Sequence, residues 1–313
     1  MNHILLTVDV EDWFQVENFK KYIPFSSWSS HELRVEKNTH RILDLFDSFG
    51  FEQSAISYEP HKKVRCTFFV LGWLAERLPN LVREIHSRGH EVASHGYCHN
   101  LCVECSSHEL KRDLTDSKRL LEDIIGDRVY GYRAPSFSIN DDILRSIEDG
   151  GYLYDSSYNS FGLHGRYGKL NLNGDGAQGI SYKISDKFYE LPISNLHIIN
   201  PINYQLSAMT SGRNIKDHFV LPWGGGGYFR LIPAWFFILG VRSILKKDKA
   251  YVFYIHPWEI DDEQPRVNNA SVLCKFRHYI NLGKCSSKLS ILIESFSKCH
   301  FVTCYRYITE STE

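Results

Sequence analysis

Residues 91–99 read Glu91-Val92-Ala93-Ser94-His95-Gly96-Tyr97-Cys98-His99, a short strand-like run that ends in two histidines four positions apart. If the chain turns helically after Ser94, positions i and i+4 share a face, and both imidazoles can bind one metal ion. A catalytic divalent metal usually has a third protein ligand and an open position for water. The remaining sequence should therefore supply a third ligand, an acid and a base.

Segments typical of parallel strands alternate along the chain with helical ones. The strand segments are apolar and rich in β-branched residues, and they lie at 4–10, 64–71, 91–94, 129–133, 152–156, 188–193 and 250–255. Helical spacing of apolar residues, with capping signals at Ser106 and Asn140, predicts helices over 33–49, 79–88, 106–125, 140–148, 232–245 and most of 271–297. This alternation predicts an α/β fold with a parallel sheet, open or closed into a barrel.

The amino-acid composition limits which partners the chain is expected to bind and in which cellular compartment it is expected to work. Lys and Arg number 36 against 37 Asp and Glu, so the charge balance does not favour binding to nucleic acid or to an anionic membrane. The N-terminal apolar run is short and is followed by acids, and no later apolar run is long enough to span a membrane. We therefore expect a soluble, cytoplasmic protein with eight cysteines as free thiols or ligands, and leave peripheral membrane association open.

Three carboxylates follow the first predicted strand, in Thr7-Val8-Asp9-Val10-Glu11-Asp12. The third metal ligand should lie at the C-terminal end of a neighbouring strand, where α/β enzymes place their chemistry. Strand alternation puts Asp9 and Glu11 on one face and Asp12 at the turn.

Two further residues lie at predicted strand ends. Arg133 is always charged and can hold a carboxylate in its ionised form. His256 follows the apolar strand 250–255 and can act as a general acid.

Together these strand ends resemble the polysaccharide (NodB-like) deacetylases, a family of carbohydrate esterases. The matching motifs are Thr7-Val8-Asp9 with Glu11-Asp12, Ser94-His95-Gly96-Tyr97-Cys98-His99, Arg133-Ala134-Pro135-Ser136 and Ile255-His256. The segments 221–230 and 256–266 resemble a subfamily with a C-terminal extension, found in bacterial exopolysaccharide and exosortase-associated gene clusters. The resemblance implies a distorted (β/α) barrel of about seven strands over residues 1–266, with a helical extension over 267–313 packed on it.

The resemblance also implies an activity, namely metal-assisted removal of an N-acetyl group from an amino sugar. In that scheme Asp9 is the base, Arg133 orients it, His256 is the acid, and His95 and His99 hold the metal. This sequence has Val10 where the family has the second of two adjacent aspartates. We predict Asp12 as the third ligand, with Glu11 as the alternative. A site that holds no metal is a further alternative.

The expected cofactor is a divalent metal, zinc first, with cobalt, nickel or iron as alternatives. The expected substrate is an amino-sugar-containing glycan, a glycolipid or a nucleotide sugar in surface-polysaccharide or glycolipid assembly. We predict substrate contacts at Tyr97, Pro135, Trp223, Gly225 and Trp258. Tyr97 can equally be a packing residue, and the glycines at 224–227 can equally form a tight loop with positive φ.

Three alternative functions remain at this point. The same fold can hydrolyse another linear amide, such as a ureide or formamide, or serve as a degenerate sugar-binding protein. From a different class, Cys98, Cys102 and Cys105 have the spacing of a radical-SAM iron–sulfur triad. That motif follows the third strand rather than the first, which argues against a cluster.

Overall fold

The computed structural model describes residues 1–49, 63–162, 167–172, 177–199 and 218–312, and all statements below refer to these. Its sheet has the order β11-β1-β2-β3-β4-β5-β8-β7-β6, and every neighbouring pair from β11 to β8 is parallel. The parallel strands are β1 (His3–Val10), β2 (Cys66–Val70), β3 (Glu91–Ser94), β4 (Gly131–Tyr132), β5 (Tyr154–Asp155), β8 (Tyr189–Glu190) and β11 (Ala250–Ile255). Each of these strands falls inside a segment predicted from the sequence or extends it by one residue.

Shorter strands complete the sheet and form a separate ribbon. β6 (Ala177–Gln178) and β7 (Ser181–Lys183) are antiparallel additions next to β8, and β12 (His300–Phe301) pairs with the start of β1. β9 (Leu196–Ile199) and β10 (His218–Leu221) make a two-stranded ribbon of their own.

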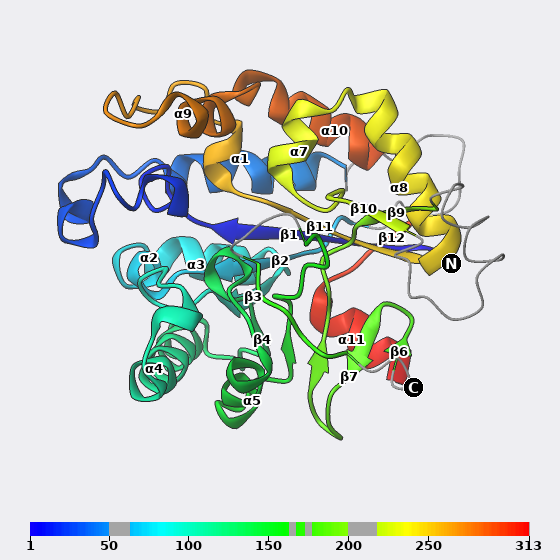
Figure 1. Ribbon diagram of the computed structural model, residues 1–313, viewed down its shortest axis with the longest axis horizontal. Helices are drawn as coiled ribbons and strands as arrows, with labels where there is room; N and C mark the ends of the chain where they lie inside the picture. Colours follow the sequence, from blue (N-terminus) through cyan, green and yellow to red (C-terminus); the bar gives the residue numbers. More distant parts are fainter. Residues whose placement is uncertain (50–62, 163–166, 173–176, 200–217, 313) are drawn as a thin grey trace, which may run out of the picture.

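Helices cover the outside of the curved sheet. Figure 1 shows α1, α8 and α10 on one side of β1 and β11, and α2 to α5 on the other. The helices are α1 (Val35–Ser48), α2 (Gly72–Arg77), α3 (Pro79–Ser87), α4 (Ser107–Ile125), α5 (Asp141–Asp149), α7 (Gly226–Leu231), α8 (Ala234–Asp248), α9 (Val272–Tyr279), α10 (Cys285–Ser295) and α11 (Cys304–Thr312). The predicted capping box at Ser106 and Asn140 cap are confirmed, since each side chain accepts from a backbone N–H three residues on. No helix in the described ranges combines the length and apolar character that crossing a bilayer requires.

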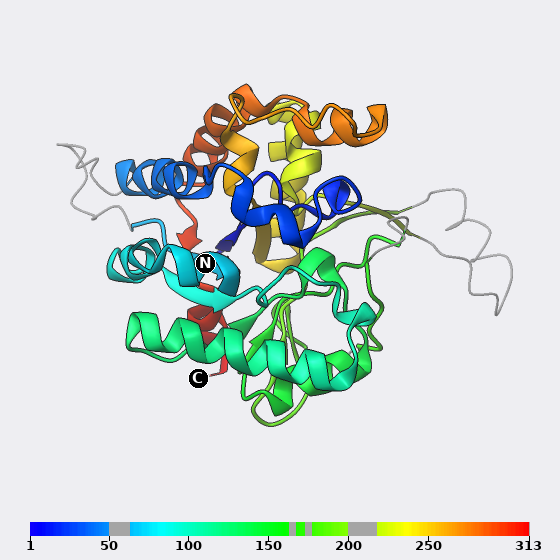
Figure 2. The same ribbon diagram turned by 90° about the vertical axis from the view of Figure 1, so that its left-hand side faces the viewer.

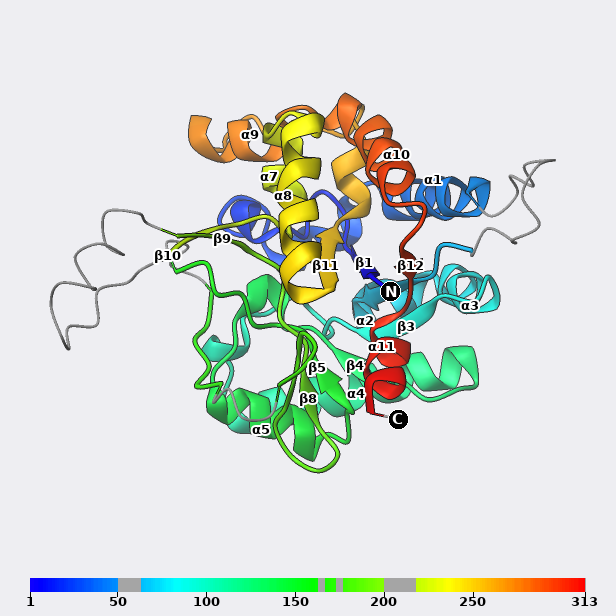
Figure 3. The ribbon, with the colours of Figure 1, turned by 90° about the vertical axis from the view of Figure 1, so that its right-hand side faces the viewer.

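The two faces of β1 belong to different cores. Ile4, Leu6 and Val8 pack outward against the helices, whereas Leu5 faces the interior of the barrel with Phe69 and Val252. α11 contributes Cys304, Tyr307 and Ile308 to this interior core, and Figure 3 shows α11 at the end where the parallel strands begin. Because side chains alternate along a strand, Asp9 and Glu11 share the face of Leu5.

The opposite end of the barrel carries the loops that follow the strands. In Figure 2 the blue segment after β1 lies between the cyan region of α2 and the orange α9. That segment includes the short 3-10 helix η1 (Glu17–Phe19) and is lined with buried aromatic side chains, among them Phe14, Phe19 and Trp28. The C-terminal extension therefore reaches the end of the barrel where the conserved chemistry of α/β folds is placed.

Candidate active site

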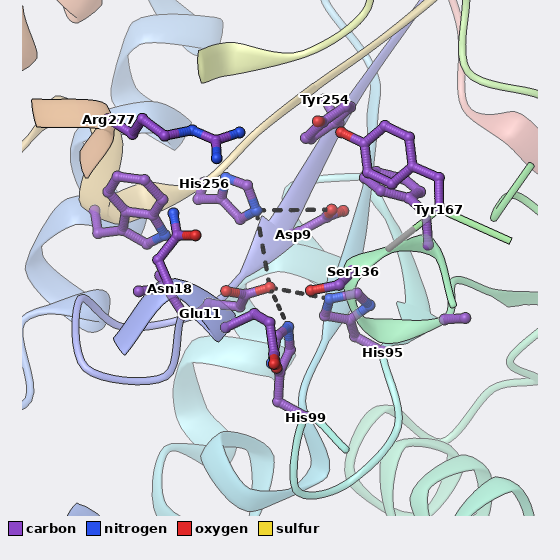
Figure 4. Close-up of a pocket in the computed structure, with 15 residues that line it drawn as sticks. Asp9, Glu11, Asn18, His95, His99, Ser136, Tyr167, Tyr254, His256 and Arg277 are labelled. Atoms are coloured by element: carbon purple, nitrogen blue, oxygen red, sulfur yellow. Dashed lines mark hydrogen bonds and ion pairs between the residues drawn. The ribbon is translucent and has the colours of Figure 1, made fainter. Parts of the chain in front are cut away.

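A small pocket opens at the C-terminal ends of β1, β3, β4 and β11, with a volume of about 130 Å³. Figure 4 shows that side chains from these strand ends point into it. Five of the catalytic and metal-ligand candidates from the sequence line this pocket, namely Asp9, Glu11, His95, His99 and His256. Phe137, Tyr167, Tyr254 and Trp258 supply aromatic walls.

Glu11, His95 and His99 bring three ligand atoms together in a fully buried group. Glu11 Oε1 lies 3.1 Å from His95 Nε2 and 3.0 Å from His99 Nε2. Burial alone would raise the pKa of Glu11, but the charges of His99 and His256 and hydrogen bonds with His95 and His99 hold that pKa well below its usual range. One carboxylate and two imidazoles are a donor set that suits zinc and other first-row divalent metals.

The other ring nitrogen of His95 shows why a cation fits here. His95 Nδ1 lies 2.7 Å from the Arg133 carbonyl oxygen, which can only accept, so Nδ1 carries the proton. In the neutral ring, the bare Nε2 then faces the Glu11 carboxylate, and two lone pairs oppose each other unless a cation lies between them. The residues present therefore fit a bound divalent metal, with a backbone carbonyl fixing the tautomer of one ligand.

The two histidines meet through left-handed backbone rather than through a helix, so the helical expectation is wrong. Residues 95–99 are irregular, and Gly96 and His99 have φ of 72° and 55°. Ser136 and Phe137, which follow β4 and line the same pocket, also have positive φ, of 51° and 59°. Non-glycine residues seldom adopt this conformation, and such strain concentrates at functional sites.

Asp12, which we predicted as the third ligand, has a different role. Its Oδ2 accepts hydrogen bonds from the backbone N–H groups of Arg34 and Val35, at 2.7 and 2.9 Å, and its Oδ1 accepts from Trp13 N–H at 2.8 Å. Burial raises the pKa of Asp12 to about 6 although these bonds oppose the rise. Asp12 thus caps the start of α1, and Glu11, the alternative, is the carboxylate beside the histidines.

Asp9 and Arg133 form a buried ion pair at the pocket floor. The Arg133 guanidinium donates to Asp9 Oδ1 at 2.6 Å and to Thr7 Oγ1 at 2.7 Å. Its other nitrogens donate to the carbonyl and the hydroxyl of Ser156, both at 2.9 Å. Arg133 has no solvent exposure, and Asp9 is only 2% exposed. The guanidinium thereby fixes the orientation of the carboxylate that faces the pocket.

His256 lies across the pocket from Glu11, and Glu259 orients its imidazole ring. Its Nε2 is 4.0 Å from Asp9 Oδ2 and 3.8 Å from Glu11 Oε1, and its Nδ1 is 2.7 Å from Glu259 Oε1. Burial lowers the pKa of His256, but Glu11, Glu259 and Asp9 outweigh burial and raise it to about 9. Sequence reasoning missed Glu259, although an acid three residues after a histidine in a helical turn is a usable signal.

Glu259 is itself held by a buried arginine that reaches the C-terminal extension. Arg230 Nε donates to Glu259 Oε2 at 2.7 Å, and its terminal nitrogens donate to the carbonyls of Arg277, His278 and Ile280. Trp258 stacks between His256 and His278, with ring-centroid distances of 5.2 and 4.1 Å. The extension is thus connected to His256 both by ion pairing and by ring stacking.

Of the five predicted substrate contacts, the structure places only Trp258 in the pocket wall. Tyr97 turns outward and donates to Glu76 at 2.8 Å, and Pro135 is buried beside the lining residues Ala134 and Ser136. Trp223 is a core residue, because its indole donates to the Phe237 carbonyl at 2.8 Å and its ring stacks on Phe237.

Gly225 and Gly226 are required by close packing rather than by positive φ or a ligand. A Cβ on Gly225 would lie 2.5 Å from the Tyr254 hydroxyl, and one on Gly226 would collide with the Glu259 carboxylate. The glycine loop therefore leaves room for the side chains that shape the pocket.

The three cysteines with cluster-like spacing do not meet at one site in the described part of the chain. Cys102 turns into the core, where its Sγ lies 3.4 Å from the Tyr132 hydroxyl, while Cys98 and Cys105 line a separate outer hollow. Burial raises the pKa of Cys102 to about 12 and that of Cys98 to about 11, which disfavours the thiolates a cluster needs. The radical-enzyme alternative is not supported.

Two family models match adjoining parts of the chain. Residues 36–154 match the family model "Polysaccharide deacetylase", and residues 156–308 match "Domain of unknown function (DUF3473)". A peptidoglycan deacetylase-like protein of Gibberella zeae is 31% identical over 157 residues, 49% of this chain and 43% of the relative. A chitooligosaccharide deacetylase of Sinorhizobium fredii is 31% identical over 90 residues, 28% of this chain and 42% of the relative. The chain thus spans less than half the length of these curated relatives.

Solved structures share the fold across most of the chain. A candidate polysaccharide deacetylase from Mycobacterium smegmatis has a TM-score of 0.53 at 19% identity, with 96% of this chain and 85% of that chain covered. An allantoinase has a TM-score of 0.52 at 13% identity, with coverage of 96% and 86%. At such identities the likeness concerns the fold, which confirms the predicted distorted barrel. The two family matches adjoin each other, and the match to polysaccharide deacetylases includes the strand ends that carry His95, His99 and Arg133.

Proposed function

We propose that this protein is a metal-dependent hydrolase that removes the N-acetyl group from an amino sugar in surface-polysaccharide or glycolipid biosynthesis. The observation that carries the proposal is one pocket that contains a carboxylate–histidine–histidine group, a buried Asp9–Arg133 pair and the Glu259-oriented His256. The names of the matched relatives support it, since they are deacetylases of peptidoglycan or chitooligosaccharide.

We assign the cation to Glu11, His95 and His99, with zinc as first choice and cobalt, nickel or iron as alternatives. When bound, a divalent cation polarises the amide carbonyl and lowers the pKa of a water molecule. Arg133 does not replace this chemistry, because its guanidinium is engaged with Asp9.

Three residues of the chain handle protons and orientation. Asp9 takes a proton from the attacking water, whose oxygen bonds to the carbonyl carbon, and Arg133 holds Asp9 in position. The carbon–nitrogen bond then breaks to give acetate, and His256 Nε2 donates its proton to the leaving amine nitrogen. Glu259 keeps His256 protonated and aimed into the pocket.

We extend the proposal to the compartment and the form of the substrate. All eight cysteines are free thiols, as suits a reducing cytoplasm. A nucleotide- or lipid-linked sugar is the substrate form that a cytoplasmic enzyme of polysaccharide assembly would meet.

Acetate release tests the proposal. The protein is stripped with a chelator, reloaded separately with zinc, cobalt, nickel or iron(II), and incubated with an N-acetylglucosamine oligosaccharide and with UDP-N-acetylglucosamine. We expect acetate and free amine in equal amounts, lost in Asp9→Asn and His256→Gln but kept in Asp142→Asn, an exposed change on α5.

Other products would point elsewhere. Turnover of ureides or formamides without acetate release from sugars would favour a different linear amide as substrate. Sugar binding with no turnover in any of the metal forms would favour a binding protein. Val10 suggested that a metal-binding carboxylate had been lost, but Glu11 supplies one.

A further inference from the structure

The outer face of α9 exposes large apolar side chains to solvent. Val272 is 80% exposed, Leu273 64% and Phe276 52%. Positions i, i+1 and i+4 lie on one side of a helix, so these three side chains share one face. The other side of α9 packs on the molecule, since His278 is buried and stacks on Trp258. Single exposed apolar residues are ordinary, but a group of this kind marks a contact surface.

Cations border the apolar face of α9. Lys275 and Arg277 lie on the same helix, and helical geometry places them on opposite borders of the apolar face. The whole chain is nearly neutral, yet residues 264–293 contain five lysines or arginines and no aspartate or glutamate. The helix and its flanks therefore carry an excess of positive charge around an exposed apolar stripe.

α9 lies beside the catalytic pocket. Figures 1 and 2 show it at the catalytic end of the molecule, next to the segment that follows β1. Arg277 lines the pocket, and Figure 4 shows its guanidinium directed from α9 towards His256. The segment after β1 adds two exposed aromatic side chains, Tyr22 and Phe25. The Ser271 N–H donates to the Tyr22 hydroxyl at 3.3 Å, so this segment and the start of α9 are in contact.

A bilayer surface fits both properties of α9. Helices that lie in the headgroup region combine an apolar face, which enters the boundary of the acyl chains, with Lys and Arg beside it. The long cationic side chains extend towards the phosphate groups, and anionic lipids strengthen the attraction. The charge is supplied by α9 and its flanks, because Lys20, on the segment after β1, is already balanced by Glu17 and Glu104 at 3.9 and 3.2 Å.

We propose that α9, together with Tyr22 and Phe25, docks on an anionic phospholipid bilayer and holds the catalytic pocket at its surface. There the pocket reaches the amino sugar of a lipid-linked substrate. The docking does not depend on the proposed function, whereas the lipid-linked form of the substrate rests on it.

Vesicle co-sedimentation tests the docking. The protein is mixed with vesicles of phosphatidylcholine alone and with vesicles that also contain phosphatidylglycerol. We expect binding to the phosphatidylglycerol vesicles that weakens at high salt and is roughly tenfold or more weaker in the double variant Leu273→Ser/Phe276→Ser. Trp235→Ser is the matched control, because it removes an apolar side chain that is 67% exposed on α8 instead. Circular dichroism checks that both variants are folded.

Turnover separates the docking from the proposed function. Acetate release is measured from an N-acetylglucosamine lipid embedded in the phosphatidylglycerol vesicles and from a soluble N-acetylglucosamine oligosaccharide. The double variant should lose activity on the lipid-linked substrate and keep its kcat/KM on the oligosaccharide. If neither substrate releases acetate, the proposed function fails, and vesicle binding alone decides the docking.

Four results would overturn the inference. The first is that the unaltered protein does not bind phosphatidylglycerol vesicles or binds phosphatidylcholine vesicles equally well. The second is that the double variant binds as well as the unaltered protein, and the third is that only Trp235→Ser loses binding. The fourth is self-association that the double variant abolishes, measured by light scattering, because α9 would then contact a second copy of the chain.

Discussion

Glu11 and Asp12 are adjacent and both buried, yet their carboxylates meet different partners. Glu11 faces His95 and His99, whereas Asp12 accepts the N–H groups at the start of α1. We expect Glu11→Gln to weaken zinc binding by roughly tenfold or more, and Asp12→Ala to keep zinc while lowering the free energy of unfolding by about 1–2 kcal/mol. Elemental analysis and urea unfolding measure the two effects. Loss of zinc in Asp12→Ala with normal stability would restore Asp12 as the ligand.

His256 provides a pH signature at the same scale. Its pKa is raised to about 9, with burial opposed by Glu11, Glu259 and Asp9. The protonated ring is the proposed acid, so kcat/KM should fall as pH rises through this pKa. Glu259→Gln removes an anion from Nδ1, lowers the pKa of His256 and moves the alkaline limb of the profile to lower pH. If the alkaline limb of Glu259→Gln lies at the same pH as that of the control variant Asp142→Asn, another group donates the proton.

Local patterns could predict which residues lie at strand ends but not what each one touches. Asp9, Glu11, His95, His99 and His256 all line one pocket, as their positions after apolar strands suggested. The role of Asp12 depends on where α1 begins, because it accepts from the N-cap residue Arg34, 22 residues later in the chain. The burial of Trp223 likewise depends on its contact with Phe237 in α8, which the sequence around Trp223 does not indicate.

At the scale of elements, Arg230 joins α7 to η6 (Pro257–Ile260) and to the end of α9. Both Arg230 and Glu259 are almost fully buried, at 2% and 1% exposure. Removing one partner of such a pair leaves the other charge uncompensated, so Arg230→Met should lower the free energy of unfolding by about 3–5 kcal/mol. The exposed Arg145→Gln should change it by no more than about 0.5 kcal/mol, and denaturant titration compares the two. Equal stabilities would mean that Glu259 is neutralised in another way.

Strands were predictable from their apolar runs, and helices where apolar periodicity and a capping residue were both present. The parallel strands, the capping box of α4 and the Asn140 cap of α5 follow from local sequence because their signals are local. The turn at residues 95–99 was not predictable, since helical and left-handed paths both bring His95 and His99 together. The short strands β6, β7, β9 and β10 lack a clear apolar alternation and depend on their neighbours.

For the whole molecule, alternation of strands and helices was enough to predict a parallel α/β fold, and the family resemblance implied its closure into a distorted barrel. The order β11-β1-β2-β3 places β1 and β11 side by side although they lie at opposite ends of the chain. What the sequence could not show is how the extension joins the barrel. β12 pairs with β1, α11 fills the interior at the strand starts, and α9 borders the catalytic end. The boundary at residue 266 stays a prediction, and these contacts cross it.

The pairing of β1 with β11 also has a consequence for synthesis on the ribosome. Thr7 Oγ1 donates to the Phe253 carbonyl, 246 residues further along the chain. At cellular elongation rates, on the order of ten to fifty seconds separate the emergence of the two strands. During that interval one edge of β1 lacks its partner, and a bare strand edge invites pairing with other chains. The yield of active protein should therefore depend on translation speed and on chaperones that bind nascent chains.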